Sequence, residues 1–133
     1  MKPRHFPALF TLVASLALAG CHSHHGRPSD ARMAQQIAQQ FNKEFGDKLV
    51  QVLNLKQSQG HITAKGHYIA LVHFDMKFTK GLAEVKKQNE DQAMELRVLF
   101  DKFHAGDTKP ITDEVLFQKT DKGWVLINSR QRR

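Results

Sequence analysis

Two histidines and one aspartate have the spacing best suited to acid–base chemistry in this sequence. His67, His73 and Asp75 stand at odd positions of a stretch whose even positions are mostly apolar. If the stretch is a β-strand, all three lie on one face, with His73 and Asp75 about 7 Å apart along it. Such a pair could orient an imidazole for proton transfer, or bind a metal ion with a third ligand. A solvated strand face is the alternative interpretation.

Other catalytic signatures are absent. The sequence has no Gly-x-Ser-x-Gly, phosphate-binding glycine loop, His-Glu-x-x-His or EF-hand motif. Its one cysteine excludes a disulfide scaffold and a Cys-rich zinc site. His22, His24 and His25 could hold zinc or copper only weakly, because no carboxylate or thiolate accompanies them. We therefore predict a protein that is not an enzyme and needs neither a cofactor nor a metal.

The first twenty residues have the pattern of a secretory signal peptide. Lys2 and Arg4 precede an apolar run from Ala8 to Leu18. About 20 residues are needed to span a bilayer. The run is too short for that and fits the core of a signal peptide. A membrane anchor or a buried helix is the alternative.

The apolar run ends at Leu18-Ala19-Gly20-Cys21, which resembles the lipobox of bacterial lipoproteins. The resemblance implies cleavage between Gly20 and Cys21, a diacylglyceryl group on the Cys21 thiol, and acylation of the new amino group by a fatty acid such as palmitate. Two or three acyl chains hold a protein firmly at a membrane. His22 follows in place of an aspartate, which by resemblance to enteric bacteria favours the outer membrane, facing the periplasm. An unmodified thiol is the alternative.

The positive charge is concentrated at the ends of the chain. The whole sequence has 20 basic and 13 acidic residues and a net charge of +7. Residues 30–129 have 14 basic and 13 acidic residues, which leaves +1. A nucleic-acid-binding domain concentrates Lys and Arg on its folded surface, so we predict no nucleic-acid partner. The Arg-rich tail could touch anionic lipid headgroups or remain solvated.

Three segments are predicted along the chain: a signal peptide (1–20), a lipidated cysteine with a polar tether (21–29), and a single domain with the Arg-rich tail (30–133). The length allows one compact domain. The composition, 41% hydrophobic and 25% charged, is that of a globular protein.

A long amphipathic helix is predicted to open the domain. From Asp30 onwards apolar residues recur every three to four positions, opposite Gln, Lys and Asn. Ser29 or Asp30 can cap the helix, and Gln57-Ser-Gln-Gly60 is predicted to end it, so that it covers 30 to about 55. The predicted buried stripe is Met33, Ile37, Phe41, Phe45, Leu49 and Val52 or Leu53.

The helix is predicted to be followed by strands. An alternation of period two indicates a long strand over 62–78, and 79–92 fits a helical turn or an exposed loop. Both strand and helix fit 93–104, and we predict a strand because a meander follows. Its strands are predicted at 111–119 and 124–128, joined by a turn with Gly123.

The expected fold is therefore α+β, one long N-terminal helix packed on a curved antiparallel sheet of about four strands. This order and the closing Thr120-Asp-Lys-Gly-Trp-Val-Leu126 resemble small cystatin-like or NTF2-like lipoproteins. The resemblance implies a cystatin-like/NTF2-like roll, and some NTF2-like members use an acid in the cone as a base. Full NTF2-like cones carry further helices and strands, which this sequence lacks.

Three functions are open. The first, which we predict, is a non-enzymatic binding module of the cell envelope that engages an envelope protein. The second is a carrier of a lipid or small apolar ligand between sheet and helix, and the third is an NTF2-like enzyme using His73 and Asp75. Apolar residues expected on both sheet faces favour a pocket or a partner surface: Ile69, Leu71, Leu99, Phe103 and Leu116. Phe117 and Trp124 are predicted to belong to the core.

Overall fold

The structure is a computed structural model and describes residues 26–131. The signal peptide, the lipobox with Gly20 and Cys21, and His22, His24 and His25 lie outside these residues. The described chain forms α2 (Asp30–Phe45), β1 (Val50–Ile62), β2 (His67–Phe78), α3 (Leu82–Gln88), α4 (Glu90–Phe100), β3 (Thr108–Thr120) and β4 (Gly123–Gln131).

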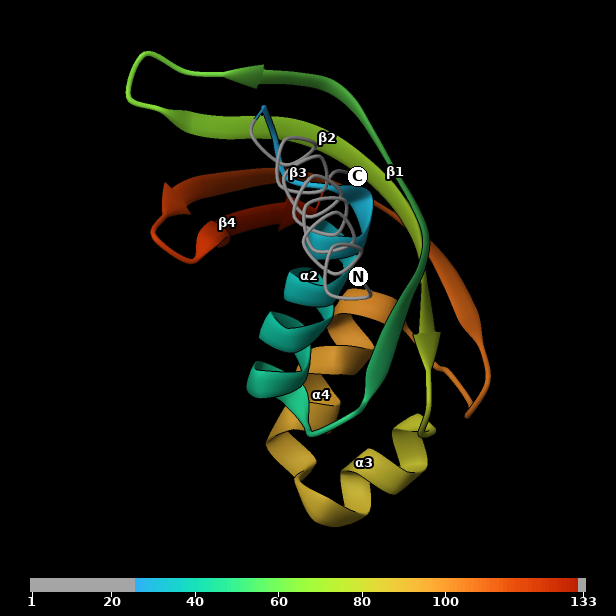
Figure 1. The fold of residues 1–133 in the computed structure, drawn as a ribbon. Coiled ribbons are helices and arrows are strands. Elements are labelled where there is room, and N and C mark those ends of the chain that lie inside the picture. Colours follow the sequence, from blue (N-terminus) through green and yellow to red (C-terminus); the bar gives the residue numbers. More distant parts are fainter. Residues whose placement is uncertain (1–25, 132–133) are drawn as a thin grey trace, which may run out of the picture.

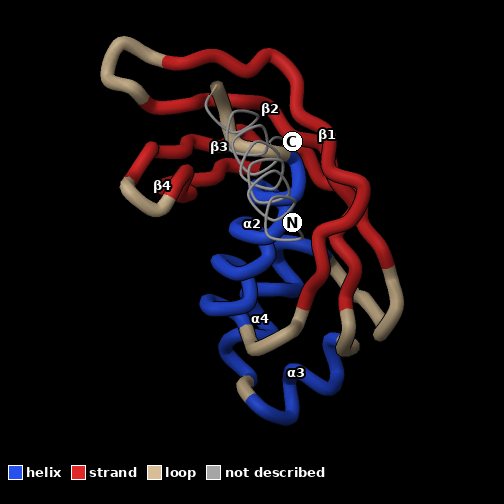
Figure 2. Tube along the Cα trace, in the orientation of Figure 1, coloured by secondary structure: helices blue, strands red, loops and turns tan. Residues whose placement is uncertain are grey.

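The four strands form one antiparallel sheet in the order β1-β2-β3-β4. The sheet is curved, and α2 and α4 lie on its concave side (Figure 1). Figure 2 shows α3 next to α4 at the lower end of the domain, and no helix among residues 26–131 covers the convex side of the sheet. The predicted α+β class with a four-stranded antiparallel sheet is confirmed.

Helix α2 is shorter than predicted. It begins where expected, because the Ser29 side chain accepts a hydrogen bond from the Arg32 backbone N–H at 3.1 Å. It ends at Phe45 because Gly46 takes φ 146°, a conformation that only glycine adopts without strain. The predicted extension to about residue 55 is wrong.

Strand β1 occupies the segment beyond this glycine. Val50 and Leu55 are the buried residues of β1, and Leu49 is buried just before the strand begins. Two register shifts interrupt the pairing with β2, near Asn54 and Gln59, which have φ values of 56° and 54°. These bulges disturb the period-two pattern that would have revealed a strand.

Strand β2 is shorter than the predicted strand over 62–78, because 63–66 form a turn that ends at Gly66. Within β2 every second residue is buried, as predicted. The buried face consists of Tyr68, Ala70, Val72, Phe74, Met76 and Phe78.

The predicted strand over 93–104 is wrong, because 93–100 belong to helix α4 and 101–104 lie in the connection that follows it. The Asn89 side chain caps α4 by accepting a hydrogen bond from the Gln92 backbone N–H at 3.1 Å. Ala93, Leu96 and Phe100 are buried with helical spacing. Met94 and Val98, which would share a strand face with Leu96 and Phe100, are exposed. Residues 79–92 were predicted as a helical turn or an exposed loop. The structure has helix there, in α3 and the first residues of α4.

The closing hairpin of β3 and β4 agrees with the prediction, although both strands are longer than expected. Gly123 has φ 101° in the turn between them. Phe117 and Trp124 are core residues, as predicted. Phe41, Phe78, Phe100 and Phe103 join α2, α4 and the end of β2 through ring contacts of 3.9–5.6 Å between centroids.

Side-chain amides of α2 reach both edges of the sheet. Gln36 accepts a hydrogen bond from the Leu126 backbone N–H at 2.7 Å and donates one to the Trp124 carbonyl at 3.1 Å, on β4. Asn42 makes the same pair of bonds with the backbone of Val50 on β1, at 2.8 and 3.2 Å. Each amide therefore satisfies backbone groups that an edge strand leaves unpaired.

None of the helices within residues 26–131 combines the length and the apolar character needed to cross a membrane.

Candidate functional site

A pocket of about 200 Å³ lies between α2, α4 and the concave side of the sheet. Its lining combines apolar and polar residues. Helix α2 contributes Ile37, Phe41 and Phe45, α4 contributes Leu99 and Phe100, and the sheet contributes Met76 and Ile111.

Asp113 is the buried carboxyl of this pocket. It stands on β3 opposite Val72 of β2, on the inward face, and its exposed fraction is only 8%. The Oδ1 atom of Asp113 is buried and has no hydrogen-bond partner among the described residues. Burial raises the pKa of Asp113 from 3.8 to about 6, because the ionised form is poorly solvated there.

Three further polar residues line the pocket. Gln40 and Glu44 come from α2, and Ser129 comes from β4. Together with Asp113 they give the pocket two carboxyl groups, and no Lys, Arg or His occurs among the lining residues whose side chains the structure describes. The pocket therefore favours a group that donates hydrogen bonds or carries positive charge.

The chemistry available at Asp113 follows from its pKa. A carboxyl with a pKa of about 6 is mostly ionised at neutral pH and can still exchange a proton there. It can accept a hydrogen bond from a ligand, and perturbed carboxyls in pockets are frequent at functional sites. Either role differs from that of an ordinary core residue.

The predicted residues His67, His73 and Asp75 lie elsewhere, on the convex side of the sheet. The Nδ1 atom of His73 shares a 3.0 Å hydrogen bond with the Thr112 hydroxyl. The Oδ2 atom of Asp75 accepts a 3.0 Å hydrogen bond from the Asn54 side-chain amide. The two side chains thus have separate partners, and their joint role in acid–base chemistry stays a prediction.

Within the described part of the chain, no three His, Cys, Asp or Glu residues are placed to hold a metal ion together.

The apolar residues predicted for both sheet faces divide into two groups. Ile69, Leu71 and Leu116 lie half-buried on the convex side. Leu99 and Phe103 do not belong to the sheet, because 93–104 is not a strand. Leu99 lines the pocket from α4, and Phe103 is buried beside Phe78.

Asp113 was missed by the sequence reasoning, although a signal for it exists. In the strand predicted at 111–119, the apolar residues Ile111, Val115 and Phe117 occupy odd positions, and Asp113 shares their parity. A charged residue in an inward position of a strand is unusual unless it has a partner or a function. Its place in a pocket depends on α2 and α4, which the pattern of one strand cannot reveal.

Comparisons with protein-family models, with curated proteins and with solved structures found no match to this chain.

Proposed function

We propose that this protein is a non-enzymatic binding protein of the bacterial cell envelope and that its ligand site is the pocket around Asp113. The observation that carries the proposal is the Oδ1 atom of Asp113, which is buried without a hydrogen-bond partner among residues 26–131. A buried carboxylate without a partner costs folding free energy. A ligand that donates a hydrogen bond to it removes that cost.

The chemistry of the pocket defines the class of ligand. Its two carboxyl groups and apolar lining residues suit a small molecule with an amine and an apolar body. A volume of about 200 Å³ corresponds to about seven water molecules in the liquid. The ligand is therefore compact, or it enters with one end only.

The place of action follows from the N-terminal sequence. The lipobox-like Leu18-Ala19-Gly20-Cys21 supports a chain that is anchored by acyl groups on Cys21, in the outer membrane and facing the periplasm. We further propose that the fold is a small cystatin-like/NTF2-like roll. The curved sheet with α2 on its concave side supports this assignment. A carboxyl group, Asp113, in the pocket beneath α2 supports it as well.

The proposal is tested with cyclohexylamine as a probe, added to residues 22–133, which include every core residue named above. We expect cyclohexylamine to shift the amide NMR signals of residues around Asp113, and cyclohexanecarboxylate to leave them unchanged. Asp113→Asn should weaken cyclohexylamine binding at least about tenfold, in line with the loss of a charged hydrogen bond. The matched variant Asp75→Asn, on the other side of the sheet, should bind like the wild type. Equal binding by wild type and Asp113→Asn would refute the site.

A protein partner on the convex side is the second candidate. Ile69, Leu71 and Leu116 form an apolar strip there, flanked by Leu53 and Val125 with exposed fractions of 38% and 36%. Native mass spectrometry of residues 22–133 after exposure to envelope extract separates the two candidates. A retained mass of several hundred daltons supports the pocket, and a protein-sized adduct supports the convex side.

A further inference from the structure

A second concave site lies at the start of α2, on the side of the domain from which the chain leads back to Cys21. It is a hollow of about 430 Å³ with Arg27, Arg32, Lys119 and Lys122 in its lining. We call these four residues and the space between them the basic hollow. Pro28 and the Trp124 ring supply its apolar part.

Among the described residues, the lining of the basic hollow contains no carboxylate to balance its charge. Residues 27–129 have 15 basic and 13 acidic residues, so four cations around one hollow are a local concentration. Asp30 and Asp121 are close in sequence and lie outside the lining. The Oδ1 atom of Asp30 accepts a hydrogen bond from the Gln57 amide of β1 at 2.7 Å.

The basic hollow is also built from defined contacts. The Nε atom of Arg32 donates a hydrogen bond to the Trp124 carbonyl at 3.2 Å, which orients the guanidinium and leaves four further N–H groups on it. The Nζ atom of Lys119 lies 5.8 Å from the centroid of the Trp124 ring. The Trp124 indole N–H is buried and lacks a partner among the described residues. The hollow can therefore offer several donors to one anion.

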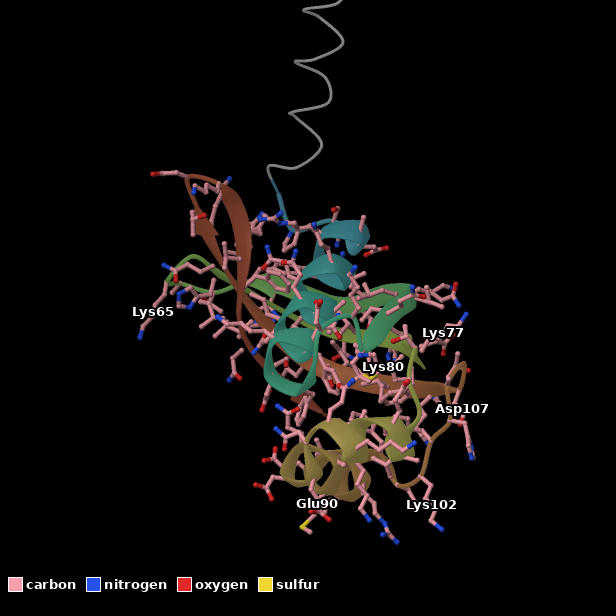
Figure 3. All side chains as sticks on the ribbon, turned by 90° about the horizontal axis from the view of Figure 1, so that it is seen from below. Lys65, Lys77, Lys80, Glu90, Lys102 and Asp107 are labelled. Carbon is pink, nitrogen blue, oxygen red and sulfur yellow. The ribbon has the colours of Figure 1, made fainter. Side chains whose placement is uncertain are left out.

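The position of the basic hollow relates it to the membrane. Arg27 stands six positions after Cys21, so the two residues can be at most about 20 Å apart at full extension of the chain. Helix α2 is about 24 Å long, and it separates the hollow from the α3–α4 end. Figure 3 shows Lys102 and Glu90 at that end, away from the blue first turn of α2.

We propose that the basic hollow binds the phosphate of anionic phospholipid headgroups in the membrane that holds the anchor. This contact adds a second point of attachment beside Cys21 and fixes which side of the domain faces the lipid. It places the start of α2 at the membrane and the α3–α4 end away from it. The inference rests on the proposed envelope location, but it does not depend on ligand binding at Asp113.

The test uses residues 22–133 without acyl groups and sedimentation with vesicles. We expect binding to vesicles with 30 mol% phosphatidylglycerol in phosphatidylcholine and none to phosphatidylcholine alone. Each basic residue near an anionic surface contributes about 1 kcal/mol, or about fivefold in partitioning. The triple variant Arg27→Gln, Lys119→Gln, Lys122→Gln should therefore partition onto the vesicles on the order of a hundredfold more weakly than the wild type. The double variant Arg27→Gln, Lys122→Gln keeps the contact of Lys119 with Trp124, and its partitioning should lie between those of the wild type and the triple variant.

A matched triple variant provides the control. Lys86→Gln, Lys87→Gln, Lys102→Gln removes the same charge from the α3–α4 end, where these lysines line another hollow. This variant should bind the vesicles within about twofold of the wild type. Equal loss in both triple variants would overturn the proposal, because binding would then follow net charge alone. An absence of vesicle binding by the wild type would overturn it as well.

Glycerol 3-phosphate distinguishes a headgroup from a soluble phosphate. At millimolar concentration and constant ionic strength it should not displace the chain from the vesicles. Displacement would reassign the basic hollow to a soluble phosphate ester. Asp113→Asn should bind vesicles like the wild type, so failure here and failure of the pocket proposal are separate results.

Discussion

Burial of the Asp113 carboxyl lowers the free energy of unfolding of this fold. Its neighbours in β3, at the inward positions Ile111, Val115 and Phe117, are buried apolar residues. A leucine or valine at this position would bury apolar area at no electrostatic cost. A carboxyl in the same place favours its protonated form, and this links stability to pH.

The first prediction concerns the pH dependence of stability. The folded pKa of about 6 exceeds the model value of 3.8, so the folded state binds more protons between these values. Stability due to Asp113 is therefore complete below about pH 4 and is lost as the pH rises through 6. About two pKa units correspond to about 3 kcal/mol. The free energy of unfolding of Asp113→Asn, relative to that of the wild type, should therefore rise by up to about 3 kcal/mol from pH 4 to pH 7. Urea unfolding at both pH values measures this difference.

A second substitution controls for packing at the same site. Asp113→Ala also removes the carboxyl but leaves a cavity, whose cost does not depend on pH. Its stability relative to wild type should change with pH as it does for Asp113→Asn. If the free energy of unfolding changed with pH in the same way in the wild type and in both variants, the raised pKa of the buried Asp113 carboxyl would be contradicted.

At the scale of elements, α2 acts as a brace between the two edges of the sheet. Gln36 reaches β4 and Asn42 reaches β1, so that one helix satisfies backbone groups on both edge strands. A small open sheet benefits from this, because unpaired edges invite association with other chains.

The second prediction tests this brace. Gln36→Ala removes two hydrogen bonds to β4 and should lower the free energy of unfolding by about 1–3 kcal/mol, since each bond contributes about 0.5–1.5 kcal/mol. Urea unfolding measures the loss. Gln39→Ala, at an exposed position of the same helix, should change stability by less than about 0.5 kcal/mol. Similar losses in the two variants would mean that the bonds to β4 contribute nothing specific.

At the scale of the whole molecule, the basic hollow lies at the start of α2, where the described chain begins. The pocket around Asp113 lies between α2 and α4, nearer the other end of α2, since Glu44 and Phe45 line it. In the proposed membrane orientation, a ligand would enter this pocket from the side away from the lipid.

The third prediction concerns attachment. Cys21→Ser in the full chain should abolish labelling by palmitate and shift the protein from the membrane fraction to the soluble fraction at 1 M salt, where the basic hollow is screened. The wild type should stay with the membrane at the same salt and be released only by detergent. A Cys21→Ser variant that remains with the membrane at 1 M salt would contradict lipid anchoring at this residue.

Local pattern was sufficient for much of this fold. The cap at Ser29, the buried alternation of β2 and the turn at Gly123 are determined by residues close in sequence, and all three are found as predicted. The α+β class and the antiparallel sheet follow from these elements, but the fourth strand is β1 and not the segment 93–104.

Tertiary structure decided the rest. The helical pattern of α2 continued to about residue 55, and residues 93–104 fit both helix and strand. The outcome depended on Gly46, on the cap at Asn89 and on which face met the core. Pockets likewise require distant segments. Asp113 becomes a buried, unpaired carboxyl only because α2 and α4 cover the concave side of the sheet, and the basic hollow exists only because the β3–β4 turn lies beside the start of α2. Desolvation and local charge density depend on neighbours in space, and a pattern along one strand or helix does not contain them.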